Sequence, residues 1–123
     1  MLGTSPIIAF VATTNAERSK AFYEKILGLT FVADEPFALV FNADGVMVRI
    51  FKVETLTPAV HTVLGWNVED IKAVIDGLCA KGVVFERFPS LEQDPDGAWT
   101  SPSGAKVAWF KDPDGNVLSL TQF

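Results

Sequence analysis

Arg49 combines a distinctive chemistry with an informative position in this sequence. The segment around it alternates Met47, Arg49 and Phe51 with apolar residues, and a strand places every second side chain on the same face. Arg49 therefore brings a planar fork of hydrogen-bond donors, suited to a carboxylate or phosphate, into an apolar stripe. A salt bridge from Arg49 to a carboxylate across the sheet or across a dimer interface is the competing interpretation.

Few other side chains could contribute chemistry. His61 is the only histidine, and imidazole is suited to general-base catalysis near neutral pH. A histidine at a strand end that bonds to a loop is the competing interpretation. No His–Asp arrangement is visible around Ser119, so a nucleophilic triad is not supported. The residues expected to line a ligand pocket are Arg49, His61, Ser119, Phe10, Phe51 and, at its entrance, Trp99.

Composition limits the class of protein. The 123 residues fit a single domain, 1–123, and 49% of them are hydrophobic, which is ample for a core. The net charge is −5 and the ten basic residues form no run, which argues against nucleic acid and an anionic membrane as partners. The single cysteine, Cys79, cannot form an internal disulfide, and this fits a reducing cytoplasm. We expect no signal peptide and no transmembrane helix.

The pattern of apolar residues predicts two similar halves, at about 5–54 and 60–123. In the first half we expect a strand at 6–13, a helix from a Thr14–Glu17 capping box to Gly28, and strands at 30–33, 37–42 and 46–52. In the second half we expect a strand at 60–67, a helix that starts at Asn67-x-x-Asp70 and ends at Gly82, and strands at 83–88, 99–101, 107–111 and 117–122.

The halves form an internal repeat. Gly28 and Gly82 are separated by the same number of positions as Phe31 and Phe85, and an Asp-Gly turn precedes the last strand of each half. Neither half alone covers its apolar sheet face. We therefore expect an α+β fold in which two βαβββ modules form one curved mixed sheet, with a concave cup inside and the helices outside.

Three segments carry a resemblance to a known family. They are Ala21-Phe-Tyr-Glu-Lys-Ile-Leu-Gly-Leu29, Gly65-Trp-Asn-Val-Glu-Asp-Ile71 and Asp112-Pro-Asp-Gly-Asn-Val-Leu118. The chain resembles the vicinal oxygen chelate superfamily, which includes glyoxalase I, bleomycin-resistance proteins and extradiol dioxygenases. The resemblance implies the fold more strongly than any function, because this fold hosts many activities. It also implies a homodimer.

Metal-using members of that superfamily carry His, Glu or Gln at four places that face the cup. By spacing, these places fall here at Ile8, Arg49, Val63 and Ser119. Ile and Val supply no ligand atom, and Ser is a weak ligand. At an effective dielectric constant of about 20, a guanidinium 4 Å from a divalent ion repels it by about 8 kcal/mol before screening. We therefore expect no metal at these residues, although binding through other residues, His61 included, stays open.

Three functions follow from this interpretation. The first is a metal-independent binding protein for a small, partly apolar anion held by Arg49. The second is an enzyme, either a metal-dependent lyase or dioxygenase with other ligands, or a metal-free one that uses Arg49 and His61 as weak catalytic candidates. The third is a structural or interaction module with a vestigial cup.

Overall fold

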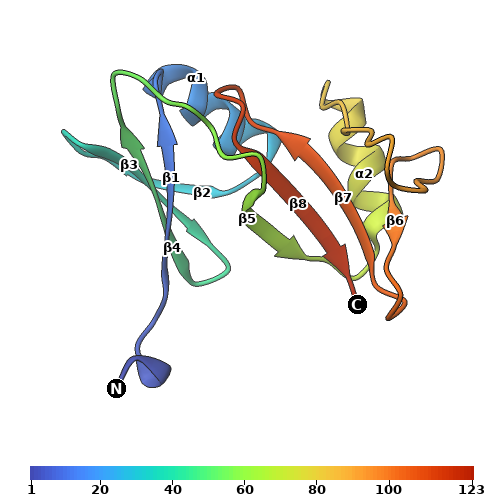
Figure 1. The fold of residues 1–123 in the computed structure, drawn as a ribbon. Helices are drawn as coiled ribbons and strands as arrows, with labels where there is room; N and C mark the ends of the chain where they lie inside the picture. Colours follow the sequence, from blue (N-terminus) through green and yellow to red (C-terminus); the bar gives the residue numbers. More distant parts are fainter. The chain divides into compact units, whose positions relative to one another are not determined.

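The computed structural model describes all 123 residues, and the chain divides into two compact units, Met1–Thr57 and Pro58–Phe123. Each unit contains one four-stranded mixed sheet and one principal helix (Figure 1). The expected α+β class and its two βαβββ-type modules are confirmed. Hydrogen bonds join the strands into two sheets instead of the single curved sheet that we expected, because each module completes its strand pairing within itself.

Unit 1 places its first strand beside its last one. β1 runs parallel to β4, and β4, β3 and β2 follow as antiparallel neighbours. A parallel neighbour needs a crossover, which the helix supplies. The elements are η1 (Leu2–Thr4), β1 (Ile8–Thr13), α1 (Ala16–Ala21), the π-helical turn η2 (Phe22–Ile26), β2 (Thr30–Asp34), β3 (Ala38–Ala43) and β4 (Val46–Lys52).

Asn15, not Thr14, begins the first helix. Its side chain accepts a hydrogen bond from the Arg18 backbone N–H at 3.1 Å, and its own N–H donates to Thr13 Oγ1. The predicted Thr14–Glu17 capping box is therefore wrong by one residue. Asn is among the best N-cap residues, and here it has the extended backbone that an N-cap requires.

One face of the unit 1 sheet carries the core. Leu39, Phe41, Val48 and Ile50 are buried on it, and Tyr23 of η2 lies against Phe41 with ring centroids 6.2 Å apart. The helix segment thus covers this face. The other face of the sheet carries Phe10, Arg49 and Phe51.

Unit 2 repeats this order. β5 runs parallel to β8, which pairs antiparallel with β7, and β7 pairs with the short β6. Of the two residues in the predicted Asn67–Asp70 start, Asp70 is the cap, and it accepts a hydrogen bond from the Ala73 N–H. The elements are β5 (Thr62–Asn67), α2 (Ile71–Ala80), β6 (Trp99–Thr100), β7 (Lys106–Lys111) and β8 (Val117–Gln122).

Residues 83–88, predicted as a strand, form no regular strand. Only Phe85 makes a bridge, to Phe110. The Gln93 side chain accepts from the Phe88 N–H and donates to the Glu86 carbonyl, at 2.6 and 2.9 Å. A side-chain amide therefore satisfies the backbone groups that a neighbouring strand would otherwise bond.

The Asp-Pro-Asp-Gly-Asn turn connects β7 to β8, and its first residue, Asp112, holds it together. Asp112 is buried, and its carboxylate accepts from the backbone N–H groups of Asp114 and Asn116 and from the Asn116 side chain. These bonds fix the turn from inside. The motif that carried the family resemblance is thus a determinant of the fold.

Candidate ligand-binding site

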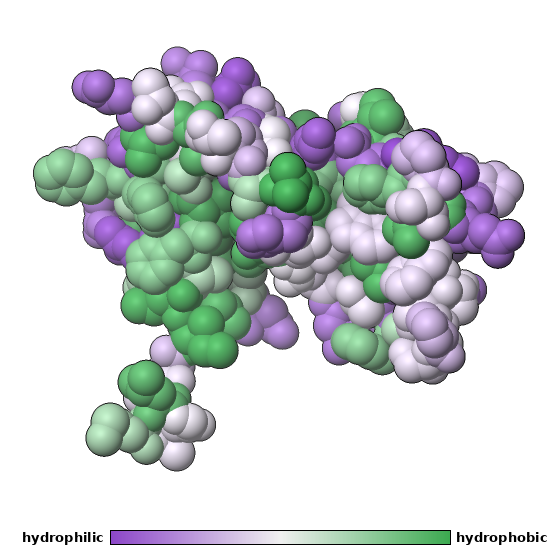
Figure 2. All heavy atoms as spheres, viewed as in Figure 1, coloured by the Kyte–Doolittle hydropathy of each residue, from purple (hydrophilic) through white to green (hydrophobic).

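The unit 1 face opposite α1 is apolar, and its apolar residues on β1 and β4 are exposed. The register aligns Ile8 with Met47 and Phe10 with Arg49, so these residues share that face with Phe51. Phe10 is 54% exposed, and its ring meets that of Phe51 edge to face at a centroid distance of 5.9 Å. Figure 2 shows hydrophobic side chains gathered over β1 and β4. Phe10, Arg49 and Phe51, which the sequence predicted to line a pocket, therefore share one face.

Arg49 lies in the middle of this apolar face and forms an ion pair. Its Nη2 donates to Glu35 Oε1 at 2.8 Å, and the two side chains are 29% and 46% exposed. The competing interpretation of Arg49, a salt bridge to a carboxylate, is thus seen in the structure. The pair uses one of the five guanidinium N–H donors, and the others make no hydrogen bond within the protein.

The four positions where the family places metal ligands do not fit a divalent metal. The neighbour of Arg49 on β1 is Phe10, while Val63 lies in a β-bulge and Gly65 takes the place beside Ser119. Apolar side chains, a guanidinium and a hydroxyl offer no set of imidazole or carboxylate donors. No group of three or more His, Cys, Asp or Glu side chains lies close enough to hold a metal ion.

In unit 2, Ser119 lies at the centre of the sheet face opposite α2. It pairs with Gly65 on one side and Trp109 on the other, and it is 7% exposed. A Cβ atom on Gly65 would lie 2.8 Å from Ser119 Oγ. The missing side chain of Gly65 therefore makes room for this hydroxyl.

Beside Ser119, the same face contains a groove of about 400 Å³. The side chains of Val117 and Lys111, which pair across β8 and β7, form part of it. Pockets of this size and mainly apolar lining are typical of small-molecule sites. The lining residues are Pro58, Ala59, Val60, Glu86, Phe88, Lys111, Gly115 and Val117.

Phe88, which forms one wall of the groove, belongs to an aromatic cluster. Phe88 meets Trp109 edge to face at 5.4 Å, and Trp109 lies 6.2 Å from Trp99, measured between ring centroids. Gln93 fixes Phe88 by accepting from its backbone N–H, and it also donates to the Gly97 carbonyl at 2.8 Å. Trp99 thus lies behind the groove wall, while its predicted place at a cup entrance stays a prediction.

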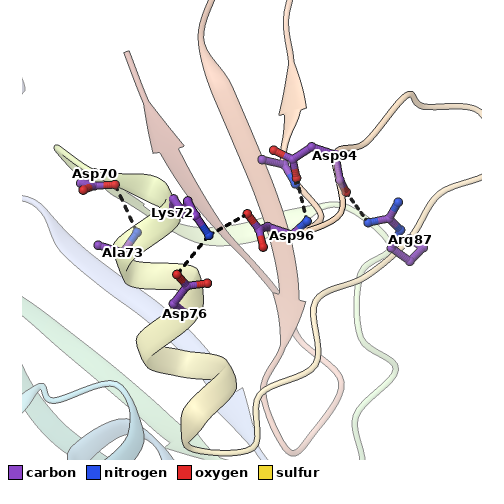
Figure 3. A network of polar contacts seen from close by, with 8 residues as sticks. Asp70, Lys72, Ala73, Asp76, Arg87, Asp94 and Asp96 are labelled. Carbon is purple, nitrogen blue, oxygen red and sulfur yellow. Dashed lines mark hydrogen bonds and ion pairs between the residues drawn. The ribbon is translucent and has the colours of Figure 1, made fainter.

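The loop behind this wall is tied to α2 by Lys72. Figure 3 shows its ammonium between Asp76 of the helix and Asp96 of the loop, at 3.2 and 3.3 Å. Hydrogen bonds to both carboxylates raise the pKa of Lys72 above its ordinary value, and the bond to Asp76 has the larger effect. Arg87 holds the same loop from its other side by donating to the Asp94 carbonyl at 2.7 Å.

His61 is exposed and lies before the start of β5. Its Nδ1 is 3.1 Å from the Thr62 carbonyl oxygen, which matches the interpretation of a strand-end histidine bonded to backbone. The sequence reasoning missed Lys111, Glu86 and Phe88 as pocket residues. Lys111 could have been found, because it has the same strand parity as Trp109 and precedes the Asp-Pro turn directly.

Comparison with known proteins supports the family. Residues 7–120 match the family described as Glyoxalase/Bleomycin resistance protein/Dioxygenase superfamily. No curated protein matches the chain. No helix of the structure is long and apolar enough to cross a bilayer.

Solved structures show the same fold at low identity. A member of the Glyoxalase/bleomycin resistance protein/dioxygenase superfamily from Sphaerobacter thermophilus is 22% identical, with a TM-score of 0.77 and all of both chains covered. A bleomycin resistance determinant encoded on the transposon Tn5 is 19% identical (TM-score 0.75, 97% of this chain and 98% of that one). A lactoylglutathione lyase from Agrobacterium tumefaciens is 18% identical (TM-score 0.74, 96% and 93%). Since the family match spans almost the whole chain and these structures share its fold, the protein belongs to the Glyoxalase/Bleomycin resistance protein/Dioxygenase superfamily.

Proposed function

We propose that this protein is a metal-independent small-molecule-binding protein of the glyoxalase/bleomycin-resistance type, and that it binds a small, partly apolar anion. The observation that carries the proposal is Arg49, a guanidinium with free donors in the centre of an exposed apolar face. Apolar surface binds the body of such a ligand, and the guanidinium binds its charge.

The ion pair with Glu35 is compatible with this role. Both partners are partly exposed, and exposed pairs contribute about 0 to 1 kcal/mol, so a ligand loses little by competing with Glu35. The guanidinium can also keep Glu35 on Nη2 and still offer two parallel N–H groups to a carboxylate. Glu35 then orients the fork toward the ligand.

The relatives support a binding role without fixing the ligand. The fold is shared with a bleomycin resistance determinant and with a lactoylglutathione lyase. The shared fold with the lactoylglutathione lyase favours a second candidate function, a lyase. Such a lyase would bind its metal through residues other than Ile8, Arg49, Val63 and Ser119. Elemental analysis of protein purified without chelator separates the two, because stoichiometric zinc, iron, nickel or manganese would contradict the metal-independent proposal.

Titration with benzoate tests the anion site directly. We expect benzoate to shift the backbone amide resonances of Phe10, Arg49 and Phe51 in two-dimensional NMR spectra, and Arg49→Ala to weaken binding at least tenfold. Arg49→Lys keeps the charge but loses the fork, so its affinity should be intermediate. Arg18→Ala, on the exposed surface of α1, is the matched control and should bind normally. Unchanged affinity in Arg49→Ala would refute the assignment.

Two further properties belong to this proposal. We also propose a homodimer, because two-fold dimers are the commonest oligomers of soluble proteins. Light scattering coupled to size-exclusion chromatography measures this, and a mass of 13.4 kDa at all concentrations would contradict it. The single cysteine fits a reducing cytoplasm, which fractionation of cells would test.

A further inference from the structure

The groove of unit 2 carries charges that the anion site at Arg49 does not use. Lys111 and Glu86 both line it, with Nζ and Oε1 3.4 Å apart. Charge-assisted N–H···O bonds are usually 2.7 to 2.9 Å long. The structure has an ion pair here but no hydrogen bond between the two groups. The ammonium donors and the carboxylate acceptors are therefore available to a third group.

The surroundings of this pair are apolar and held in place. Phe88 and Val117 line the groove beside Pro58, Ala59 and Val60. Gln93 fixes the backbone of Glu86 and Phe88, and Lys111 pairs with Val117 of β8 at the end of β7. A Cβ on Gly115 would lie 3.3 Å from Pro58 Cγ, so the glycine lets the 58–60 segment lie close. A groove held in this way needs little ordering to bind a ligand.

The two charges decide which ligand fits. An anion bound to Lys111 is also repelled by the nearby Glu86, and a cation bound to Glu86 is repelled by Lys111, so most of the attraction for either ligand is cancelled. A ligand that carries both charges on neighbouring atoms gains both attractions. An α-amino acid has its carboxylate and ammonium on the same carbon, and an apolar side chain would occupy the rest of the groove.

We propose that the unit 2 groove binds an apolar α-amino acid, with the carboxylate on Lys111, the ammonium on Glu86, and the side chain against Phe88 and Val117. This site is separate from the anion site at Arg49 and does not depend on it. Gly65 and Ser119 lie one row further along the same sheet face, outside the groove lining.

A matched series of three probes tests the proposal on the intact protein. L-phenylalanine carries both charges, 3-phenylpropanoate lacks the ammonium, and 2-phenylethylamine lacks the carboxylate. We expect phenylalanine to shift the amide resonances of Val60, Gly115 and Val117, and to bind at least tenfold more tightly than either analogue. Equal binding of 3-phenylpropanoate would overturn the proposal in favour of a simple anion site, and the absence of shifts at these amides would overturn it outright.

Variants test the two charges separately. Lys111→Gln and Glu86→Gln should each weaken phenylalanine binding at least tenfold, and the exchanged pair Lys111→Glu/Glu86→Lys should recover part of it, because both charges are again present. The exposed Lys106→Gln on the same strand and Glu92→Gln in the loop are the controls and should bind as the parent does. Normal binding by both groove variants would overturn the proposal. If a variant fails to fold, the probe series on the parent protein still decides.

Discussion

The hydroxyl of Ser119 occupies the space that a side chain on Gly65 would need. A Cβ built on Gly65 would lie 2.8 Å from Ser119 Oγ and 3.4 Å from the Ser119 carbonyl oxygen. The two residues face each other across the parallel pair β5–β8. The short side chain of Ser119 is buried and has little freedom to move away from a Cβ at position 65. The serine hydroxyl therefore requires glycine at that position.

Gly65→Ala should therefore destabilise the protein by about 1 to 3 kcal/mol, the usual cost of overpacking. Ser119→Ala, which removes the colliding oxygen, should reduce this cost in the double variant. Denaturant unfolding of the parent, both single variants and the double variant gives the coupling energy. Purely additive effects would contradict a direct clash between the two residues.

Gln93 should be important for the wall of the groove. Its amide bonds the Phe88 N–H and the carbonyls of Glu86 and Gly97. Gln93→Ala leaves these groups without partners, which costs about 1 to 3 kcal/mol for a buried group. Hydrogen exchange at the Phe88 amide should also become faster.

Two other variants sharpen this test. Gln93→Glu keeps an acceptor for Phe88 but loses the donors to both carbonyls, so it should protect the Phe88 amide better than Gln93→Ala. Glu92→Ala, the exposed neighbour, should leave both stability and exchange unchanged. Exchange at Phe88 that is the same in all three variants would show that Gln93 does not hold the wall.

Most of the fold could be predicted from the sequence, because it follows from local patterns. Alternating apolar residues located β3, β4, β7 and β8, and glycines at the ends of both helices have the positive φ that a C-cap requires (Gly28, +79°; Gly82, +94°). The segment at 83–88 was the exception. Its apolar pattern is strand-like, but it pairs with β7 only around Phe85, and a glutamine side chain in a loop bonds the Phe88 N–H and the Glu86 carbonyl, which no periodicity reveals.

The candidate site was predicted only where strand parity determines it. Parity placed Phe10, Arg49 and Phe51 on one face, as the register shows. It could not reveal that Glu35 reaches Arg49, because β2 contains a bulge and Glu35 lies just beyond its end. The unit 2 groove was missed for a similar reason, since it depends on how 58–60 and 86–88 lie against the sheet.

The helix cap in unit 1 can be assigned by comparing two neighbours. Asn15→Ala should cost about 1 kcal/mol, because its side chain bonds the Arg18 N–H at the start of α1. Asn15→Asp or Asn15→Ser should keep most of the stability. Thermal unfolding of these variants beside Thr14→Ala measures the difference. A larger loss in Thr14→Ala than in Asn15→Ala would move the cap back to Thr14.

The tie between α2 and the loop at Asp96 should depend on pH in one direction. The pKa of Lys72 is raised from 10.5 on folding, mainly by Asp76 and then by Asp96. A lysine whose folded pKa is raised contributes stability that is complete below its unfolded pKa and is lost as the pH rises through the folded pKa.

The difference in Tm between the parent and Lys72→Met should therefore be constant from pH 7 to near 10 and should disappear above 10.5. It should be small and should shrink in 1 M salt, because the Lys72 side chain is exposed. Lys106→Met is the control, and a Tm difference for Lys72→Met that persists at high pH would show that the alkyl chain of Lys72, and not its charge, holds the loop.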